Sequence, residues 1–180
     1  MARPWNLVED RLKETLGAMA EGTRKAIIAT PANQLPAVPV QQGNQGGVVY
    51  AVAARINDAG GTQQSTGQYQ QATGIHAEIQ AIDLLIFNLN GAAIPQNLVL
   101  LCSDNPCKRC AAIISAFRTT YTWTHRAVGQ SYHSNYPGAY FLPDNVLDVV
   151  ITKLTNLHVL LTNEPVKYRE NIRSAISGWG

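Results

Sequence analysis

Side chains of the kinds that bind metals and move protons lie in two short segments of the chain, GIHAEI and NPCKRC. The first segment holds His76 and Glu78, and the second holds Cys107 and Cys110. Imidazole and thiolate groups are common ligands of zinc in proteins, where four ligands usually form a tetrahedron. The residue types therefore indicate a metal site, provided that the fold brings the two segments together.

Both segments are expected to begin helices, which places their side chains where a metal could be held. In the helix expected over 105–117, Pro106 would take the first position. The two cysteines are three residues apart, so both sulfurs would lie on one face, where exposed N–H groups favour thiolate. His76 stands at the start of a helix expected over 76–89. We therefore expect two helix N-termini to meet over one metal ion.

The spacing of His76 and Glu78 fits a helix start better than a helix interior. In mid-helix, two residues correspond to about 200° of rotation, so the two side chains would face apart. If His76 is the non-helical capping residue, both can point beyond the helix end. His76, Cys107 and Cys110 would then supply three ligands, and no fourth ligand stands in a recognisable spacing. Three protein ligands leave a position for water, as in catalytic zinc sites.

The order H-A-E at 76–78 and P-C-K-R-C at 106–110 resembles a known signature. It is similar to the H-x-E and P-C-x-x-C motifs of the cytidine deaminase-like superfamily of zinc-dependent nucleobase deaminases. Twenty-seven residues separate Glu78 from Pro106, a gap usual for that superfamily. The expected order of helices and strands over about 5–162 also resembles its fold.

The resemblance implies one zinc ion per chain, held by His76, Cys107 and Cys110 and carrying a bound water or hydroxide. It implies a hydrolase acting on a C–N bond of a nucleobase amidine, in which hydroxide attacks C4 of cytosine or C6 of adenine. Glu78 would protonate the ring nitrogen and then the leaving amine, so that ammonia is released. A carboxylate beside a metal and an apolar pocket has the adjustable pKa that this task needs.

The substrate is indicated less directly than the reaction. The segment TQQSTGQYQQATG, before the zinc helix, lacks the N-x-E-N-like stretch with which free cytidine deaminases hold the ribose. The composition, rich in Gln, Asn, Thr and Gly and low in charge, resembles that of bacterial toxin-type deaminase domains. A helix expected over 144–154 would let the last two strands run parallel, as in the polynucleotide-acting branch. We therefore expect cytosine-to-uracil conversion within DNA or RNA, with an immunity protein as partner if the chain is a toxin domain.

Two other functions stay open. The net charge is only +2, and polynucleotide affinity rests largely on phosphate neutralisation, so a deaminase of a free nucleoside, nucleotide or nucleobase is the first alternative. The second is a non-catalytic zinc-containing binding module, which would have no use for the Glu78 carboxylate. The base itself also stays open between cytosine and a purine.

Several residues near the motifs or in an aromatic loop over 130–143 are candidates for substrate contact. Lys108 and Arg109 belong either to a solvated helix face or to a phosphate contact at the mouth of the site. The loop aromatics, Tyr140 among them, either pack locally or stack flanking bases. The substrate-binding candidates are Ala77, Asn57, Lys108, Arg109, Tyr132, His133 and Tyr136.

The composition predicts a single globular domain over 1–180, because 46% of the residues are hydrophobic and only 14% are charged. Helices are expected over 4–28, 76–89, 105–117, 144–154 and 164–177. Strands are expected over 48–56, 97–103, 119–129 and 157–162, with an edge strand or loop over 62–74. This alternation predicts an α/β fold, a three-layer α/β/α sandwich with a five-stranded mixed sheet, as in the cytidine deaminase-like superfamily.

The sequence gives no sign of contact with a membrane. It contains no run of 18 apolar residues, and MARPWNLVED at its start lacks an apolar signal segment. We expect the chain in the cytoplasm, or delivered as a toxin domain into the cytoplasm of a target cell. The third cysteine, Cys102, lies within an apolar run and is expected to be a buried thiol.

Overall fold

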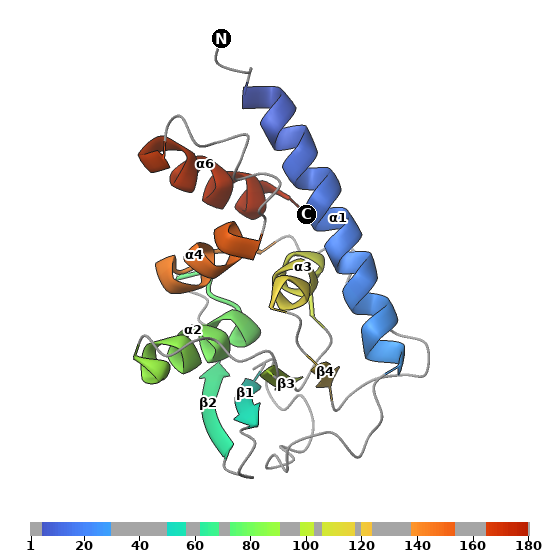
Figure 1. Ribbon diagram of the computed structural model, residues 1–180, viewed down its shortest axis with the longest axis vertical. Helices are drawn as coiled ribbons and strands as arrows, with labels where there is room; N and C mark the ends of the chain where they lie inside the picture. Colours follow the sequence, from blue (N-terminus) through green and yellow to red (C-terminus); the bar gives the residue numbers. More distant parts are fainter. Residues whose placement is uncertain are drawn as a thin grey trace.

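The structure of the protein is a computed structural model that describes residues 5–29, 50–56, 62–68, 73–90, 98–102, 106–117, 120–123, 138–153 and 165–179. The helices in these segments are α1 (Trp5–Ala29), α2 (Ala77–Leu89), α3 (Lys108–Ala116), α4 (Asp144–Lys153) and α6 (Pro165–Gly178) (Figure 1). The strands are β1 (Tyr50–Ile56), β2 (Thr62–Gln68), β3 (Leu98–Cys102) and β4 (Thr120–Trp123).

The described strands form one sheet in the order β2-β1-β3-β4. Strand β1 runs antiparallel to both β2 and β3, whereas β3 and β4 are parallel. Ala51 pairs with Cys102 and Ala53 with Leu100, and all four are buried, so they lie on the covered face. The polar strand β2 lies at the edge of the sheet, where polar side chains discourage pairing with other chains. Of the two alternatives predicted for 62–74, an edge strand or a loop, the structure shows the edge strand over 62–68.

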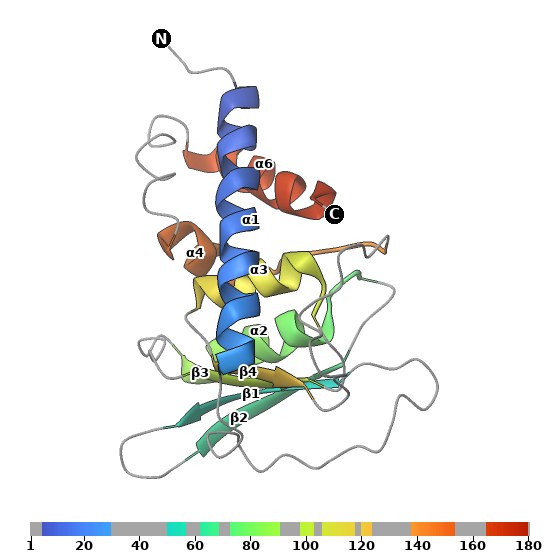
Figure 2. The same cartoon turned by 90° about the vertical axis from the view of Figure 1, so that its right-hand side faces the viewer.

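All described helices lie on one side of this sheet, above it in both Figure 1 and Figure 2. Helix α2 packs on β1 and β2, and α4 packs on α2. Helix α1 stands beside α3, its main contact, and also touches α6 and β4. The helices therefore cover one another as much as they cover the sheet.

The prediction of a three-layer sandwich with a five-stranded mixed sheet is wrong, and the cytidine deaminase-like architecture is corrected with it. Helices make up most of the described residues, and the sheet that these residues form has four strands. No described helix covers its second face. The physical reason is that α1 and α6 bury their apolar sides against other helices. The strand expected over 157–162 lies outside the described residues.

The core lies between the helices and the covered face of the sheet. In α1, Leu12, Leu16 and Ala20 are buried at intervals of four residues, which gives this helix one apolar stripe. The other side of α1 carries charged residues, and none of the described helices is long and apolar enough to cross a membrane. The largest fully buried side chains are Leu12, Leu16, Ile79, Ile82, Leu85, Leu100, Ile113, Ile114 and Leu142.

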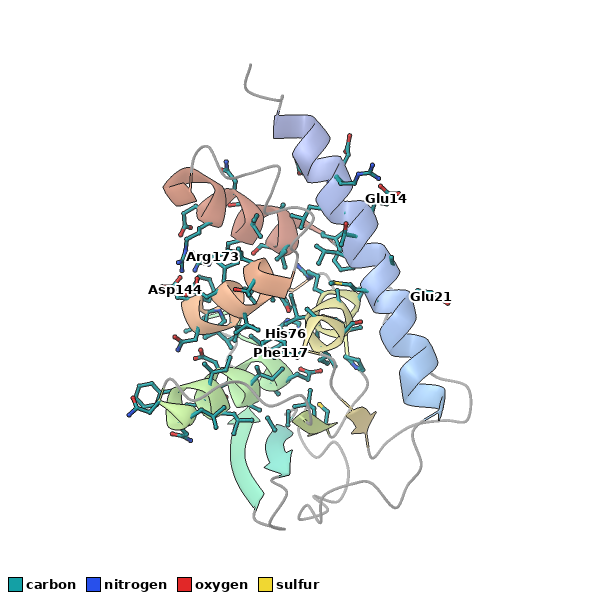
Figure 3. The ribbon with its side chains drawn as sticks, viewed as in Figure 1. Glu14, Glu21, His76, Phe117, Asp144 and Arg173 are labelled. Atoms are coloured by element: carbon teal, nitrogen blue, oxygen red, sulfur yellow. The ribbon has the colours of Figure 1, made fainter. Side chains whose placement is uncertain are left out.

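The segment that leads into α4 is held against α6 by side chains of that helix, Arg173 among them. Arg173 of α6 forms an ion pair with Asp144 of α4, and the two side chains point toward each other in Figure 3. Arg173 Nε also donates a hydrogen bond to the Leu142 carbonyl at 2.9 Å, and its guanidinium lies over the Phe141 ring. Asp144 is largely exposed, so the ion pair alone contributes little to stability. The hydrogen bond from Arg173 to the Leu142 carbonyl holds residues 138–144 more firmly than this ion pair does.

The apolar stripe of α1 can be tested by removing one of its leucines. Leu16→Ala should lower the free energy of unfolding by about 2–5 kcal/mol, because it leaves a cavity in the core. Arg11→Ala, on the exposed side of the same helix, should change it by less than about 0.5 kcal/mol. Equilibrium unfolding in urea measures both values. Equal effects of the two substitutions would contradict the described packing of α1.

Candidate metal centre

The two sequence motifs meet at the N-terminal ends of α2 and α3. His76 is the N-cap residue of α2, with an extended backbone at φ −71° and ψ 152°. Cys107 caps α3 in the same way, at φ −71° and ψ 165°. Each cap accepts the first hydrogen bond of its helix, His76 from Gln80 and Cys107 from Ala111, both at 2.9 Å. The prediction that His76 is a non-helical cap is confirmed.

The start of α3 differs from the prediction at one point. Helix α3 begins at Lys108, so Pro106 lies before the cap and does not take the first helical position. The Cys107 sulfur explains the difference, because it accepts a hydrogen bond from the backbone N–H of Cys110 at 3.4 Å. It thus acts as the capping side chain, a role usually taken by an oxygen. The backbone N–H groups at the start of α3 also favour the thiolate form of this sulfur through their dipoles.

The possible metal ligands converge on a single point. His76 Nδ1 lies 3.6 Å from Cys107 Sγ and 3.5 Å from Cys110 Sγ. All three donor atoms lie within 4.8 Å of one another, and all three residues are buried. Figure 3 shows His76 between α2 and α3.

These separations fit a tetrahedral metal ion. Zinc bonds of about 2.3 Å to sulfur and about 2.0 Å to nitrogen would place the two ligand atoms about 3.5 Å apart. Both nitrogen–sulfur distances match this value. His76, Cys107 and Cys110 therefore lie close enough to hold one metal ion. Among the described residues, this is the one group of three or more His, Cys, Asp or Glu side chains with such geometry.

The protonation of the three donors is coupled. A hydrogen bond from the Cys110 thiol lowers the pKa of Cys107 well below that of a free thiol. Burial beside that sulfur raises the pKa of Cys110. Burial lowers the pKa of His76, but the hydrogen bond and charge of Cys107 outweigh it, so this pKa is raised overall. Without a metal, the site therefore holds protons that a bound cation must displace.

Glu78 lies in the first turn of α2 and is only 4% exposed. Burial, and next the negative charge of Cys107, raise the pKa of its carboxyl group to about 7. A hydrogen bond with Cys102 opposes this shift, which places the third cysteine next to Glu78. Cys102 is buried, as predicted. The site therefore contains a carboxyl group, outside the ligand set, that can hold or release a proton near neutral pH.

Tyr140 touches two of the three donors, and the sequence motifs gave no sign of it. Its hydroxyl lies 3.6 Å from Cys110 Sγ, in a hydrogen bond. Its ring meets the His76 ring edge-on, with centroids 4.8 Å apart and planes at 68°. Tyr140 is 6% exposed. Its position in an aromatic loop was visible in the sequence, but its contact with the ligands depends on long-range packing.

Gly74 allows the segment that carries Tyr140 to come this close. It has φ +68°, which favours glycine, and a Cβ here would meet the Ala139 carbonyl carbon at 3.1 Å. The Gly74 carbonyl accepts a hydrogen bond from the Phe141 N–H at 2.8 Å. The glycine before the H-x-E motif therefore serves to bring Tyr140 beside His76.

The two cations between the cysteines face the C-terminal end of α6. Arg109 is buried, so it does not belong to a solvated helix face, and its Nη1 donates to the Ser177 carbonyl at 2.5 Å. Its Nη2 donates to the Gly138 carbonyl at 3.3 Å. The Lys108 Nζ lies 5.0 Å from the centre of the Trp179 ring. These contacts are with the protein itself and give both cations a packing role.

The other predicted substrate contacts are placed only in part. Ala77 is the first residue of α2 and is buried in the core. The remaining candidates lie outside the described residues: Asn57, Tyr132, His133 and Tyr136. For them, substrate contact stays a prediction.

Comparisons with known proteins found no match for the chain. No family model, no curated protein and no solved structure is similar to it. The function must therefore be inferred from the residues of the metal group, their surroundings and the sequence itself.

Metal binding can be tested with the three cysteines, two of which belong to the metal group. Wild-type protein should bind one metal ion per chain, measured by elemental analysis after dialysis. Cys110→Ala should weaken metal binding by more than about 100-fold, because loss of a ligand lowers metal affinity more than loss of a group that only contacts a ligand. Cys102→Ala should keep full binding and is the matched control. Affinity should also fall as the pH is lowered, since protons compete for the thiolates and imidazole.

Equal metal content in Cys110→Ala and Cys102→Ala proteins would contradict this assignment. So would a stoichiometry near zero in wild-type protein purified in the presence of zinc.

Proposed function

We propose that the chain is a zinc-dependent hydrolytic deaminase that converts cytosine to uracil, with cytosine in nucleic acid as its substrate. One observation carries the proposal: a buried carboxyl group stands beside a buried group of three metal donors. A structural zinc site usually has four protein ligands, whereas the described residues supply three. A purely structural site would also have no use for the Glu78 carboxyl group.

The donor set supports zinc as the metal. One imidazole and two thiolates form a borderline-soft set that suits zinc in a tetrahedral arrangement. His76, Cys107 and Cys110 would hold the ion. When bound, zinc lowers the pKa of a coordinated water to about 7 and so makes hydroxide available at neutral pH.

Glu78 would carry out the proton transfers of the reaction. Glu78 takes a proton from the attacking water and delivers one to the ring nitrogen next to the reacting carbon. The C–O bond forms in this step; Glu78 then takes the remaining proton from the added hydroxyl and delivers it to the exocyclic amine, so that the C–N bond breaks and ammonia leaves. A group that carries protons in both directions works best with a pKa near the working pH. Burial of the site supports the proposal further, because it keeps bulk water away from the intermediate.

The choice of cytosine in a polymer rests on the resemblance of the two motifs and on composition. Of the alternatives without a polymer, the observed contacts of Lys108 and Arg109 favour those that carry no phosphate, a free nucleoside or nucleobase, as the second candidate. Arg109 donates to the Ser177 carbonyl and Lys108 lies over the Trp179 ring, so both cations have partners within the protein. A polymer substrate would therefore need its phosphate contacts from other residues.

A panel of substrates separates the two candidates. Zinc-loaded protein is incubated with cytidine, adenosine, single-stranded DNA, double-stranded DNA and RNA, and ammonia release is measured. Sequencing of the polymers then reports cytosine-to-uracil changes. Changes in a polymer with free nucleosides untouched are the expected result. Turnover of free nucleosides alone would replace the lead candidate by the second, and no turnover of any substrate would overturn the proposal.

The role of Glu78 has its own test. Glu78→Gln should lower activity by at least about 100-fold, the usual contribution of a general acid or base. Metal content should stay at one ion per chain, because the three donors are unchanged. Asp83→Asn removes a carboxylate further along α2, where Asn145 donates to it from α4 at 3.2 Å, and should leave activity unchanged. Full activity of Glu78→Gln would exclude the proposed proton transfers.

A further inference from the structure

Tyr140 lies outside the donor group but contacts two of its members, Cys110 and His76. Its hydroxyl is hydrogen-bonded to Cys110 Sγ at 3.6 Å, and its ring packs edge-on against the His76 imidazole. A buried hydroxyl requires a partner, and in this case the partner is a sulfur of the metal group. A phenylalanine would fill the same space, so core packing alone does not account for the hydroxyl.

Tyr140 is itself held in place from two sides. The Ser177 Oγ donates a hydrogen bond to the Tyr140 carbonyl at 2.8 Å. The Arg109 guanidinium lies 4.7 Å from the centre of the Tyr140 ring, a cation–π contact. Arg109 also donates to the carbonyls of Ser177 and Gly138, so it connects α3, the 138–140 segment and the end of α6. The result is a closed set of contacts around the turn that carries both cysteines.

We propose that Tyr140 is a positioning residue of the metal centre: its hydroxyl hydrogen-bonds the Cys110 sulfur, its ring fixes the His76 imidazole, and Arg109 and Ser177 hold it in place. The inference rests on the metal site of the proposed function and is independent of the reaction and of the substrate. Groups that contact metal ligands orient them before the metal arrives, and their loss commonly weakens metal affinity by about 10–100-fold. In the metal-free structure the Cys110 thiol is the donor to the hydroxyl, but a metal-bound Cys110 has lost this proton, so the hydroxyl would then donate to the thiolate. Such a hydrogen bond lowers the energy of the sulfur lone pairs, which tunes the bond to the metal.

Tyr140→Phe is the sharpest test, because it keeps the ring and removes only the hydroxyl. Zinc affinity, measured by competition with a chromophoric chelator, should fall by about 10-fold. In cobalt-substituted protein, the thiolate-to-metal charge-transfer band should move to longer wavelength, since the sulfur lone pairs are no longer stabilised. Thr152→Val also removes a single hydroxyl, which donates to the Asp148 carbonyl on the exposed side of α4, and is the control, with no change expected in either measurement.

Ser177→Ala provides a second variant that touches no ligand. It removes the hydrogen bond to the Tyr140 carbonyl and should weaken zinc binding by about 3-fold, less than Tyr140→Phe, because the cation–π contact remains. Far-ultraviolet circular dichroism of the metal-free proteins establishes that each variant is folded. If Tyr140→Phe does not fold, the affinity of Ser177→Ala decides between the proposal and its rejection.

Two results would overturn this inference alone. The first is wild-type zinc affinity and an unchanged cobalt spectrum in the Tyr140→Phe protein. If that protein does not fold, the same result in the Ser177→Ala protein counts instead. The second is tyrosinate absorption that appears when wild-type protein binds metal and is missing in Tyr140→Phe, which would make Tyr140 a direct ligand. Failure of wild-type protein to bind any metal would overturn the proposed function and this inference together. Absence of deaminase activity in protein that binds zinc would reject only the proposed function.

Discussion

The convergence of His76 Nδ1 on two cysteine sulfurs is the constraint around which the centre of the structure is arranged. It requires the N-terminal ends of α2 and α3 to face each other, and two such ends carry partial positive charges that repel. Negative charge between them offsets this repulsion, and the lowered pKa of Cys107 shows that the site favours a thiolate there. The helix ends and the sulfurs therefore stabilise each other, and a metal cation is the natural counterpart of the second thiolate.

The same constraint explains why a third segment of the chain closes on the site. A buried imidazole and two buried sulfurs need neighbours that are apolar or hydrogen-bonded, because unpaired polar groups are costly in a core. Tyr140 provides both, and Gly74 makes room for it where any other residue would meet Ala139. The bond of Arg173 to the Leu142 carbonyl then secures this segment against α6. A one-sided stack of helices results, in place of the sandwich that the sequence pattern suggested.

Local signals in the sequence predicted the metal site more accurately than they predicted the overall architecture. The position of His76 as a cap followed from its spacing to Glu78, and the approach of the two motifs followed from their residue types. The side of the sheet on which each helix packs depends on contacts between distant elements, and apolar periodicity does not encode them. Arg109 and Tyr140 were considered for substrate contact or local packing, but their contacts around the ligand turn were missed for the same reason, because their partners lie 29 to 68 residues away in sequence. The prediction that Pro106 takes the first helical position was wrong because the Cys107 sulfur, one residue later, caps the helix.

Arg109 shows how support and electrostatics can be combined in one residue. Placed between the ligand cysteines, it is buried and carries a full positive charge, which is costly unless strong acceptors receive its protons. The carbonyls of Ser177 and Gly138 supply these acceptors, and they come from two other elements, so the cation also links the ligand turn to them. Its charge lowers the pKa of His76, in opposition to Cys107. A neutral imidazole is the form that binds a metal, so the charge of Arg109 reduces, without reversing, the rise in the pKa of His76 that Cys107 causes.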